Sequence, residues 1–375
     1  MKLFRVSDKQ FEAVSVSSKF AICGLPIRVD TYKTCSFGCR YCFSNCRKIM
    51  EFRKEFMTGN ILSLKKRLNR IFNEHDIDQT NFLDVLMNNH ITWHCGGMSD
   101  PFQHAEKRYG ATERLIEATR KYGIKILFST KSDTIYGCRP DPSLHTFQMS
   151  VTNVFNRRDI EPNVPDIKSR YELFKELKRK GFRVGIRIQP FIPEVTTTDI
   201  VDMFSDADAF TIEGIKIVPQ NKEHKDYILS SLNLDKSGFK NMGLLNLRPE
   251  IRLRLYRPFI KKFEEYGLPY SIADNDLHYL GNQKCCCGDN LVGESTDFNN
   301  TALIYKYGRD YTKEQVDEEI LKFSGCKCNQ LFTSNRKGDC VTVQDFYDKR
   351  FYQSTSPFSP QFLYKRRKKL IVCNH

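Results

Sequence analysis

Residues 34–42 read TCSFGCRYC, which places Cys35, Cys39 and Cys42 in the spacing C-x3-C-x2-C, with Tyr41 directly before the last cysteine. Cysteine thiolate is the ligand that iron–sulfur clusters select, and a loop this short can wrap three thiolates around one face of a cubane cluster. Three protein ligands for four irons leave one iron open to a small molecule. The segment therefore predicts a [4Fe–4S] cluster held by these three cysteines.

Two other metal sites compete with this interpretation. A zinc knuckle usually takes four nitrogen or sulfur ligands in two pairs, and the three-residue gap after Cys35 fits that pattern poorly. Cys46 could close a ferredoxin-like cluster as a fourth thiolate, although no second ferredoxin-type run follows. The open cluster is favoured, and Cys46 is expected on a helix after the loop as a small buried residue.

Length and cysteine content limit the class of protein. A chain of 375 residues can form one large domain with an appendage, or two domains. It has no run of eighteen apolar residues, and residues 1–18 lack the apolar core of a signal peptide, so no membrane span and a cytoplasmic location are expected. Fourteen cysteines in such a protein indicate metal binding rather than disulfides.

The net charge of the chain indicates which kinds of partner it could bind. The net charge is +14, which favours anionic partners, nucleic acid first and phosphorylated metabolites second. The tail carries the basic run Lys365–Lys369 among aromatic residues, a combination that can follow a phosphate backbone and stack bases. A solvated basic tail explains the same composition equally well.

Apolar periodicity predicts strands that alternate with helices, which indicates a parallel α/β architecture. The first twenty residues are expected to form an arm or a cap strand. Strands are expected at 26–30, 91–95, 124–129, 147–151, 184–188, 210–218 and 270–273, and helical segments at 46–75, 107–122, 167–180 and 248–266.

Functional residues of such folds lie where strands end. Gly96 and Gly97 could allow a close backbone approach, although an ordinary tight turn would use them too. Lys131 and Ser150 also follow strands, with a solvated lysine and a capping serine as the alternatives. Arg187 alternates with apolar residues, and a buried arginine is costly without an anionic partner, so it is expected to bind cofactor or substrate.

Together these features resemble the radical S-adenosylmethionine superfamily. The resemblance implies a partial (β/α)6 barrel over residues 21–275, and S-adenosylmethionine bound through its amino and carboxylate groups to the open iron. It also implies an electron donor such as a flavodoxin or ferredoxin, and reductive cleavage to a 5′-deoxyadenosyl radical. The glycine turn of these enzymes binds the methionyl amino group, a role that Ser99 or Asp100 would take here.

Several short pieces resemble the spore photoproduct lyase-like branch of this superfamily over about residues 25–275. They are Tyr32 before CSFGCRYC, the SDPFQ turn at 99–103, TKS at 130–132, Ser150, and Glu161-Pro162 before a basic helix. The branch implies that Ser99, Lys131 and Ser150 contact S-adenosylmethionine.

One position departs from the branch. The lyase has a hydrogen-donor cysteine where this chain has Gly97, so Cys95 and then Cys138 become the candidate donors. Repair of a thymine dimer does not follow from the resemblance.

Residues 276–375 form a cysteine-rich C-terminal region in which the strand–helix rhythm stops. Cys285, Cys286 and Cys287 are consecutive, and Cys326 and Cys328 follow. We expect two thiols of the triple cysteine to join Cys326 and Cys328 in a second metal site, an auxiliary iron–sulfur cluster or zinc. Ordinary reduced cysteines are the alternative.

The sequence therefore predicts a cytoplasmic radical S-adenosylmethionine enzyme that abstracts a hydrogen atom from nucleic acid or a nucleotide, in repair or modification. A second possibility is a small-molecule or peptide substrate, with the C-terminal cluster binding substrate or relaying electrons. The third is a non-enzymatic, cysteine-rich protein that binds zinc and nucleic acid and needs no barrel.

Overall fold

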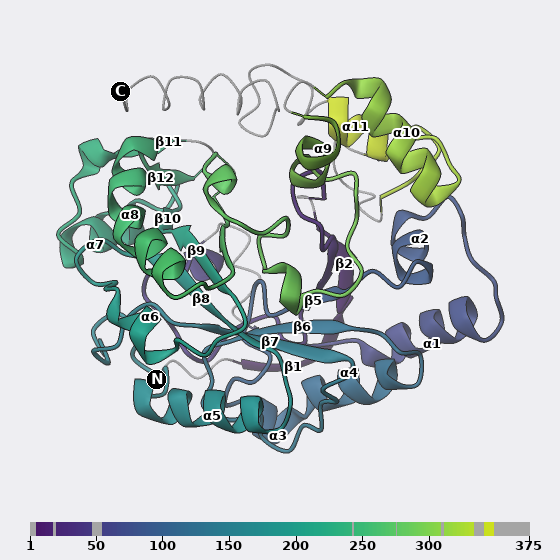
Figure 1. Cartoon of the computed structure of the whole chain (residues 1–375). Helices are drawn as coiled ribbons and strands as arrows, with labels where there is room; N and C mark the ends of the chain where they lie inside the picture. Colours follow the sequence, from purple (N-terminus) through teal and green to yellow (C-terminus); the bar gives the residue numbers. More distant parts are fainter. Residues whose placement is uncertain are drawn as a thin grey trace.

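A computed structural model describes residues 5–17, 20–46, 55–241, 244–274, 276–308, 311–333 and 341–348. Its main feature is an eight-stranded sheet in which successive strands are neighbours (Figure 1). Every pairing is parallel except that of β2 with β3. The strands, in sheet order, are β13 (Tyr270–Ile272), β9 (Phe210–Gly214), β8 (Val184–Phe191), β7 (His145–Ser150), β6 (Ile126–Thr130), β5 (Trp93–Cys95), β3 (Ile27–Val29) and β2 (Val14–Val16). The predicted parallel α/β fold is confirmed.

Helices cover the outer face of this sheet. Figure 1 shows α3, α4 and α5 lying along it. The helices of this part of the chain are α1 (Ile61–Phe72), α2 (Phe82–Asn88), α3 (Glu106–Tyr109), α4 (Ala111–Arg120), α5 (Ile167–Arg179), α6 (Asp199–Met203), α7 (Lys222–Ser231) and α8 (Pro249–Glu265). Parallel strands need such crossovers because a tight hairpin cannot join them.

Side-chain alternation along the strands separates an apolar outside from a polar inside. Phe147 and Met149 on β7 belong to the large hydrophobic core. Gln148, between them, points the other way, and its amide donates to the Thr211 hydroxyl at 3.1 Å. His94 on β5 lies on that same inner side, with Nε2 2.8 Å from the Ser129 hydroxyl. The concave interior of the sheet is therefore lined with hydrogen-bonding groups.

Three element predictions need correction. The helix expected over 46–75 begins only at Ile61, where the Asn60 side chain caps it by accepting from Ser63 N at 2.9 Å. Before it lies β4 (Glu55–Gly59), which pairs with β1 (Arg5–Phe11). Cys46 ends the short 3-10 helix η1 (Phe43–Cys46). The helical spacing of apolar residues predicts α1 correctly. The same spacing does not separate α1 from the strand β4 that precedes it.

The other two corrections are interruptions. The helix expected over 107–122 is divided at Gly110, whose φ of 54° is left-handed. The strand expected over 210–218 ends as β9 at Gly214, and β10 (Lys216–Ile217) joins a separate three-stranded sheet. That sheet is completed by β12 (Leu245–Leu247) and β11 (Phe239–Asn241), both antiparallel to their neighbours.

The C-terminal region folds back across the inside of the sheet. After β13 come η4 (His278–Leu280), η5 (Asp289–Leu291), α9 (Asn300–Tyr307), α10 (Lys313–Ser324) and α11 (Val343–Phe346). We call residues 285–296 the floor segment, because they lie against the inner side of the strands. Ser271, Thr211 and Gln148 donate to its first three carbonyls at 2.8, 3.1 and 3.2 Å. Further along, Thr146 donates to Leu291 O at 2.6 Å, and Thr296 N donates to Gly24 O at 2.9 Å.

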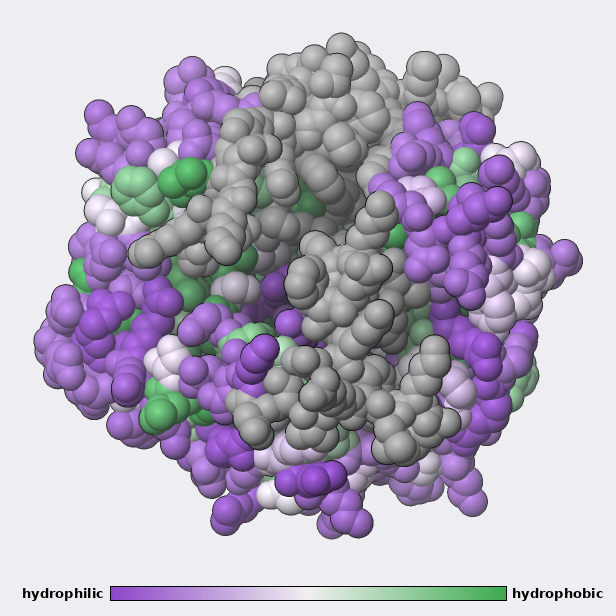
Figure 2. All heavy atoms as spheres, turned by 180° about the vertical axis from the view of Figure 1, so that it is seen from behind, coloured by the Kyte–Doolittle hydropathy of each residue, from purple (hydrophilic) through white to green (hydrophobic). Residues whose placement is uncertain are grey.

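The face of the molecule seen from behind the view of Figure 1 is mostly polar. Figure 2 shows hydrophilic side chains over most of its described surface, with small separate apolar spots. Within the described residues, no helix is long and apolar enough to cross a membrane. The basic run Lys365–Lys369 lies outside the described residues.

Candidate active site

The cysteine loop at 34–42 follows β3 and is held by groups from two later loops. The Gln103 amide, after β5, donates to Thr34 O at 2.8 Å and accepts from Ser36 N at 2.6 Å. After β7, Ile160 O accepts from Arg40 N at 2.9 Å. A loop without regular structure keeps one shape only if its backbone groups find such partners. These contacts preset the loop before any metal binds.

Within the loop the three thiols are neighbours. Cys35, Cys39 and Cys42 are each partly exposed, and they interact electrostatically with one another. Burial of the sulfur, with the nearby Asp100 carboxylate, raises the pKa of Cys35 to about 12. Burial, with Glu161, also raises the pKa of Cys39. Metal coordination deprotonates a thiol outright, so these three become thiolates when a metal binds them. Their number, position and partial exposure fit an iron–sulfur cluster.

Beside the loop lies a buried polar group centred on Glu161. Its carboxylate accepts from the Tyr41 hydroxyl and pairs with Lys131 Nζ at 3.0 Å. Lys131 Nζ also donates to the Thr152 hydroxyl at 3.1 Å and lies 5.6 Å from the Tyr41 ring centroid. Burial acts to raise the pKa of Glu161, but the positive charges of Lys131 and Arg170 lower it overall. The structure thus brings Lys131 and Tyr41 together next to the cysteines.

Ser99 and Asp100 are held by the protein itself. The Ser99 hydroxyl donates to Tyr32 O at 2.5 Å. Asp100 accepts from Thr130 Oγ1 at 2.7 Å and from Lys131 N at 2.6 Å, which ties its turn to the end of β6. Burial raises the pKa of Asp100. In this arrangement both side chains brace the site, and their contact with a cofactor stays a prediction.

The two glycines before them differ. Gly96 has a φ of +101°, and a Cβ atom there would lie 2.3 Å from Ser129 O. Gly97 has ordinary backbone geometry, and its nearest contact would be an Arg28 carbon at 3.9 Å. Of the two, only Gly96 has to be a glycine, because a side chain there would collide with the backbone of β6.

Ser150 and Arg187 lie side by side in the sheet, as paired residues of β7 and β8. The Ser150 carbonyl accepts from Arg170 and, at 3.5 Å, from Lys131 Nζ. Arg187 points into the barrel interior, donating to Glu213 at 2.9 Å and to the Gln148 side chain at 3.2 Å. The anionic partner expected for Arg187 is therefore a protein carboxylate.

Neither candidate hydrogen-donor cysteine faces the barrel interior. Cys95 is fully buried, on the side of β5 opposite to His94, in the core beneath the helices. Cys138 is in the same core, with its sulfur 3.5 Å from Glu106 Oε1. Strand alternation explains the position of Cys95, and this burial argues against a donor role for either thiol.

The C-terminal cysteines form one group and two separate positions. The sulfurs of Cys285, Cys286 and Cys287 all lie within 4.8 Å of one another. Cys326 instead donates to Gln79 O at 3.3 Å, and Cys328 contacts Asp317 at 3.1 Å. The expected combination of both groups in one site is not what the structure shows.

Sequence reasoning missed three residues. In the sequence, Glu161 belongs only to a short piece that resembles the lyase-like branch, Gln103 only ends the SDPFQ turn, and Cys23 belongs to no motif. Cys23 packs against the cluster that contains Cys285 and Cys287, and its thiol interacts electrostatically with that of Cys286. Each depends on a partner far away in the chain, and neither spacing nor periodicity reports such contacts.

The chain was compared with known proteins. No family model matches it. Uncharacterised proteins of Mycobacterium bovis and Mycobacterium tuberculosis are 25% identical over 189 residues, which is 46% of this chain and 52% of theirs. The chain thus spans about half the length of the curated relatives it matches.

Solved structures give a longer match. Spore photoproduct lyase complexed with dinucleoside spore photoproduct has a TM-score of 0.53 at 14% identity, covering 71% of this chain and 80% of the lyase. A mutant lyase with bound AdoMet and the same dinucleoside has a TM-score of 0.50 at 14% identity, covering 68% and 78%. The chain therefore has the radical S-adenosylmethionine fold in the form found in this lyase.

Proposed function

We propose that this chain, built on the fold of the radical S-adenosylmethionine enzymes, is itself such an enzyme. The observation that carries the proposal is the position of Cys35, Cys39 and Cys42. They share one preset loop, at the end of the barrel where strands finish and where enzymes of related architecture place their chemistry. Cysteine is the residue type that iron–sulfur clusters require.

The residues around the loop suit the cofactor pair. Cys35, Cys39 and Cys42 would hold a [4Fe–4S] cluster that binds S-adenosylmethionine, and this pair would supply reductive cleavage to a 5′-deoxyadenosyl radical that abstracts a hydrogen atom. Lys131 offers a cation for the methionyl carboxylate, and Glu161 holds that cation in place at 3.0 Å. The buried hydroxyls of Thr34 and Ser36 have no protein partner and could accept new hydrogen bonds beside the loop. A flavodoxin or ferredoxin would provide the electron.

The substrate we favour is nucleic acid or a nucleotide, for modification or repair. The net charge of +14 supports an anionic partner. The lyase of similar fold was solved with a dinucleoside photoproduct, which makes the same class of substrate reasonable here. The buried donor candidates Cys95 and Cys138 speak against a copy of that lyase's reaction.

A second candidate is a small molecule or peptide. Arg187 donates to both Gln148 and Glu213 inside the barrel, and such a group of polar side chains suits a compact polar substrate as well. The non-enzymatic alternative loses its support, because it gives no reason for the barrel. We also propose a cytoplasmic location, where thiols stay reduced, and a second metal at the C-terminal cysteines, argued below.

The test is anaerobic reconstitution with iron and sulfide, followed by measurement of iron content and of 5′-deoxyadenosine released under reduction. Alanine at Cys35, Cys39 or Cys42 should abolish release, because each removes one of three cluster ligands. Cys46→Ala is the matched control and should keep most of the activity. If Cys46→Ala lost the cluster as completely as the Cys35, Cys39 and Cys42 variants, a closed, ferredoxin-like site would be favoured.

A further inference from the structure

The triple cysteine forms a tight turn inside the barrel. Gly288 N donates to Cys285 O at 3.0 Å, and the φ of Gly288 is 93°. The Asp289 carboxylate holds the turn from outside by accepting from Cys285 N at 2.7 Å. The carbonyls of all three cysteines accept hydrogen bonds from strand side chains, which holds the backbone of the turn in place. Their three sulfurs lie within 4.8 Å of one another.

A fourth thiol reaches this turn from the other end of the chain. Cys23 precedes β3, and its thiol is close enough to that of Cys286 for the two to interact electrostatically. The same sulfur lies 3.5 Å from Leu25 O, which fixes its direction. Cys23 also packs in the small apolar cluster that contains Cys285 and Cys287. A backbone hydrogen bond from Thr296 N to Gly24 O at 2.9 Å joins the floor segment to the residues next to Cys23. The fold therefore keeps Cys23 close to the triple cysteine.

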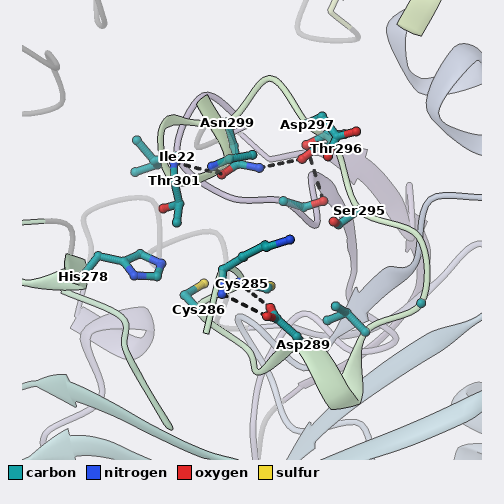
Figure 3. A pocket seen from close by; sticks show the side chains of 15 residues that line it. Ile22, His278, Cys285, Cys286, Asp289, Ser295, Thr296, Asp297, Asn299 and Thr301 are labelled. Atoms are coloured by element: carbon teal, nitrogen blue, oxygen red, sulfur yellow. Dashed lines mark hydrogen bonds between the residues drawn. The ribbon is translucent and has the colours of Figure 1, made fainter. Parts of the chain in front are cut away.

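The surroundings shield the thiols but leave an approach. Cys285 and Cys287 are buried, whereas Cys23 and Cys286 are partly exposed. Cys285 and Cys286 line a pocket of about 270 Å³ between the floor segment and residues 22–24 (Figure 3). Figure 3 shows His278 beside Cys286 at the edge of this pocket. An ion could enter from there and reach Cys285 and Cys286 first.

The spacing of the sulfurs decides which metal suits them. Four thiolates around one Zn²⁺ lie at the corners of a tetrahedron, about 3.8 Å apart for Zn–S bonds of about 2.3 Å. The sulfurs of Cys285, Cys286 and Cys287, which lie within 4.8 Å of one another, are close to that spacing. Cys23 is not part of that group, so zinc binding would draw its thiol toward the other three. A [4Fe–4S] cluster binds each thiolate to a different iron, which requires its ligands to stand farther apart. The geometry therefore favours a single ion over an auxiliary cluster.

We propose that Cys23, Cys285, Cys286 and Cys287 bind one Zn²⁺ in a closed structural site. The four ligands leave no open position, so the ion has no reactant to bind. It joins the segment that leads into β3 to the floor segment. Because β3 delivers the chain to the cysteine loop at 34–42, the ion stabilises the side of the barrel on which that loop is built. The proposal does not depend on the radical chemistry.

The test uses the full-length chain with Cys35, Cys39 and Cys42 all replaced by alanine, so that any remaining metal belongs to the second site. We expect about one zinc per chain and no acid-labile sulfide. Adding Cys23→Ser or Cys286→Ser should remove most of this zinc and lower the melting temperature. Cys326→Ser is the control and should leave the zinc in place, because the Cys326 thiol is hydrogen-bonded to Gln79 O and is not part of the proposed site.

A second measurement does not depend on variants that fold. Replacing the metal of the unaltered chain with Co²⁺ should give the intense visible absorption of tetrahedral cobalt with thiolate ligands, and zinc should displace it one for one. Iron and sulfide near four per chain in the triple variant would overturn zinc in favour of a cluster. Absence of metal would overturn the site itself, and zinc retained in Cys23→Ser would remove Cys23 from it.

Discussion

At the residue scale, the site depends on the partners of one partly buried cation, Lys131. Lys131 Nζ is 3.0 Å from Glu161 and 3.1 Å from the Thr152 hydroxyl, so the protein fixes it beside the cysteine loop. Lysines are common after strands, so the position of Lys131 in the sequence does not distinguish a cofactor-binding lysine from one exposed to solvent. Glu161 makes the difference, and the chain places it in a loop after the next strand. The sequence therefore predicts the cation but not the carboxylate that holds it.

Lys131→Ala should weaken S-adenosylmethionine binding while keeping the cluster. A hydrogen bond to a charged group contributes about 1.5–3 kcal/mol, so the dissociation constant should rise about 10- to 150-fold. Ser150→Ala should have a smaller effect in the same direction. Equilibrium binding to reconstituted protein measures both, with Lys175→Ala, an exposed lysine on α5, as control. Unchanged affinity in both variants would remove these residues from the site.

At the element scale, the centres of the strands were predictable and the contacts between elements were not. Apolar runs such as 124–129 identify strands because both faces are covered, one by helices and one by the barrel interior. The boundaries depend on single residues, such as Asn60 capping α1 or the left-handed Gly110 dividing α3 from α4. The pairing of Cys23 with the triple cysteine arises only when the C-terminal region folds back, so spacing led instead to Cys326 and Cys328.

The turn after β5 allows a sharp test of close packing between elements. Gly96→Ala adds a Cβ atom 2.3 Å from Ser129 O, at a φ of +101° that side chains rarely adopt. Backbone strain and overpacking together should lower the free energy of unfolding by about 3 kcal/mol. Gly97→Ala is the neighbouring control, because its nearest contact would be 3.9 Å away. Urea unfolding measures both, and equal stability of the two variants would contradict the packing described here.

At the scale of the whole molecule, composition and motif predicted the class of fold, because one cysteine loop and repeated strands and helices suffice for that. They did not predict that residues after 276 would cross the barrel interior and share its core. Leu303, Val316 and Ile320 of this region belong to the same hydrophobic core as β5 and β7. Such an arrangement depends on long-range burial, which leaves no periodic signal in the sequence.

The net charge of +14 leads to the last prediction, that the protein binds single- or double-stranded nucleic acid with strong salt dependence. Each phosphate neutralised by a cation releases counterions, so contact with six or more phosphates should lower affinity by about 10³ or more between about 50 and 200 mM salt. Deleting residues 358–375 should weaken binding.

Replacing the basic residues of 365–369 with glutamine separates the contribution of charge from that of the tail's aromatic residues, because the aromatic side chains are kept. If charge dominates, this variant should match the deletion in affinity and in its smaller salt slope. Fluorescence anisotropy with labelled oligonucleotides across a salt series measures all three proteins. Binding whose affinity does not change with salt, or no binding at low salt, would contradict this prediction. A small molecule or peptide would then be the better hypothesis for the substrate.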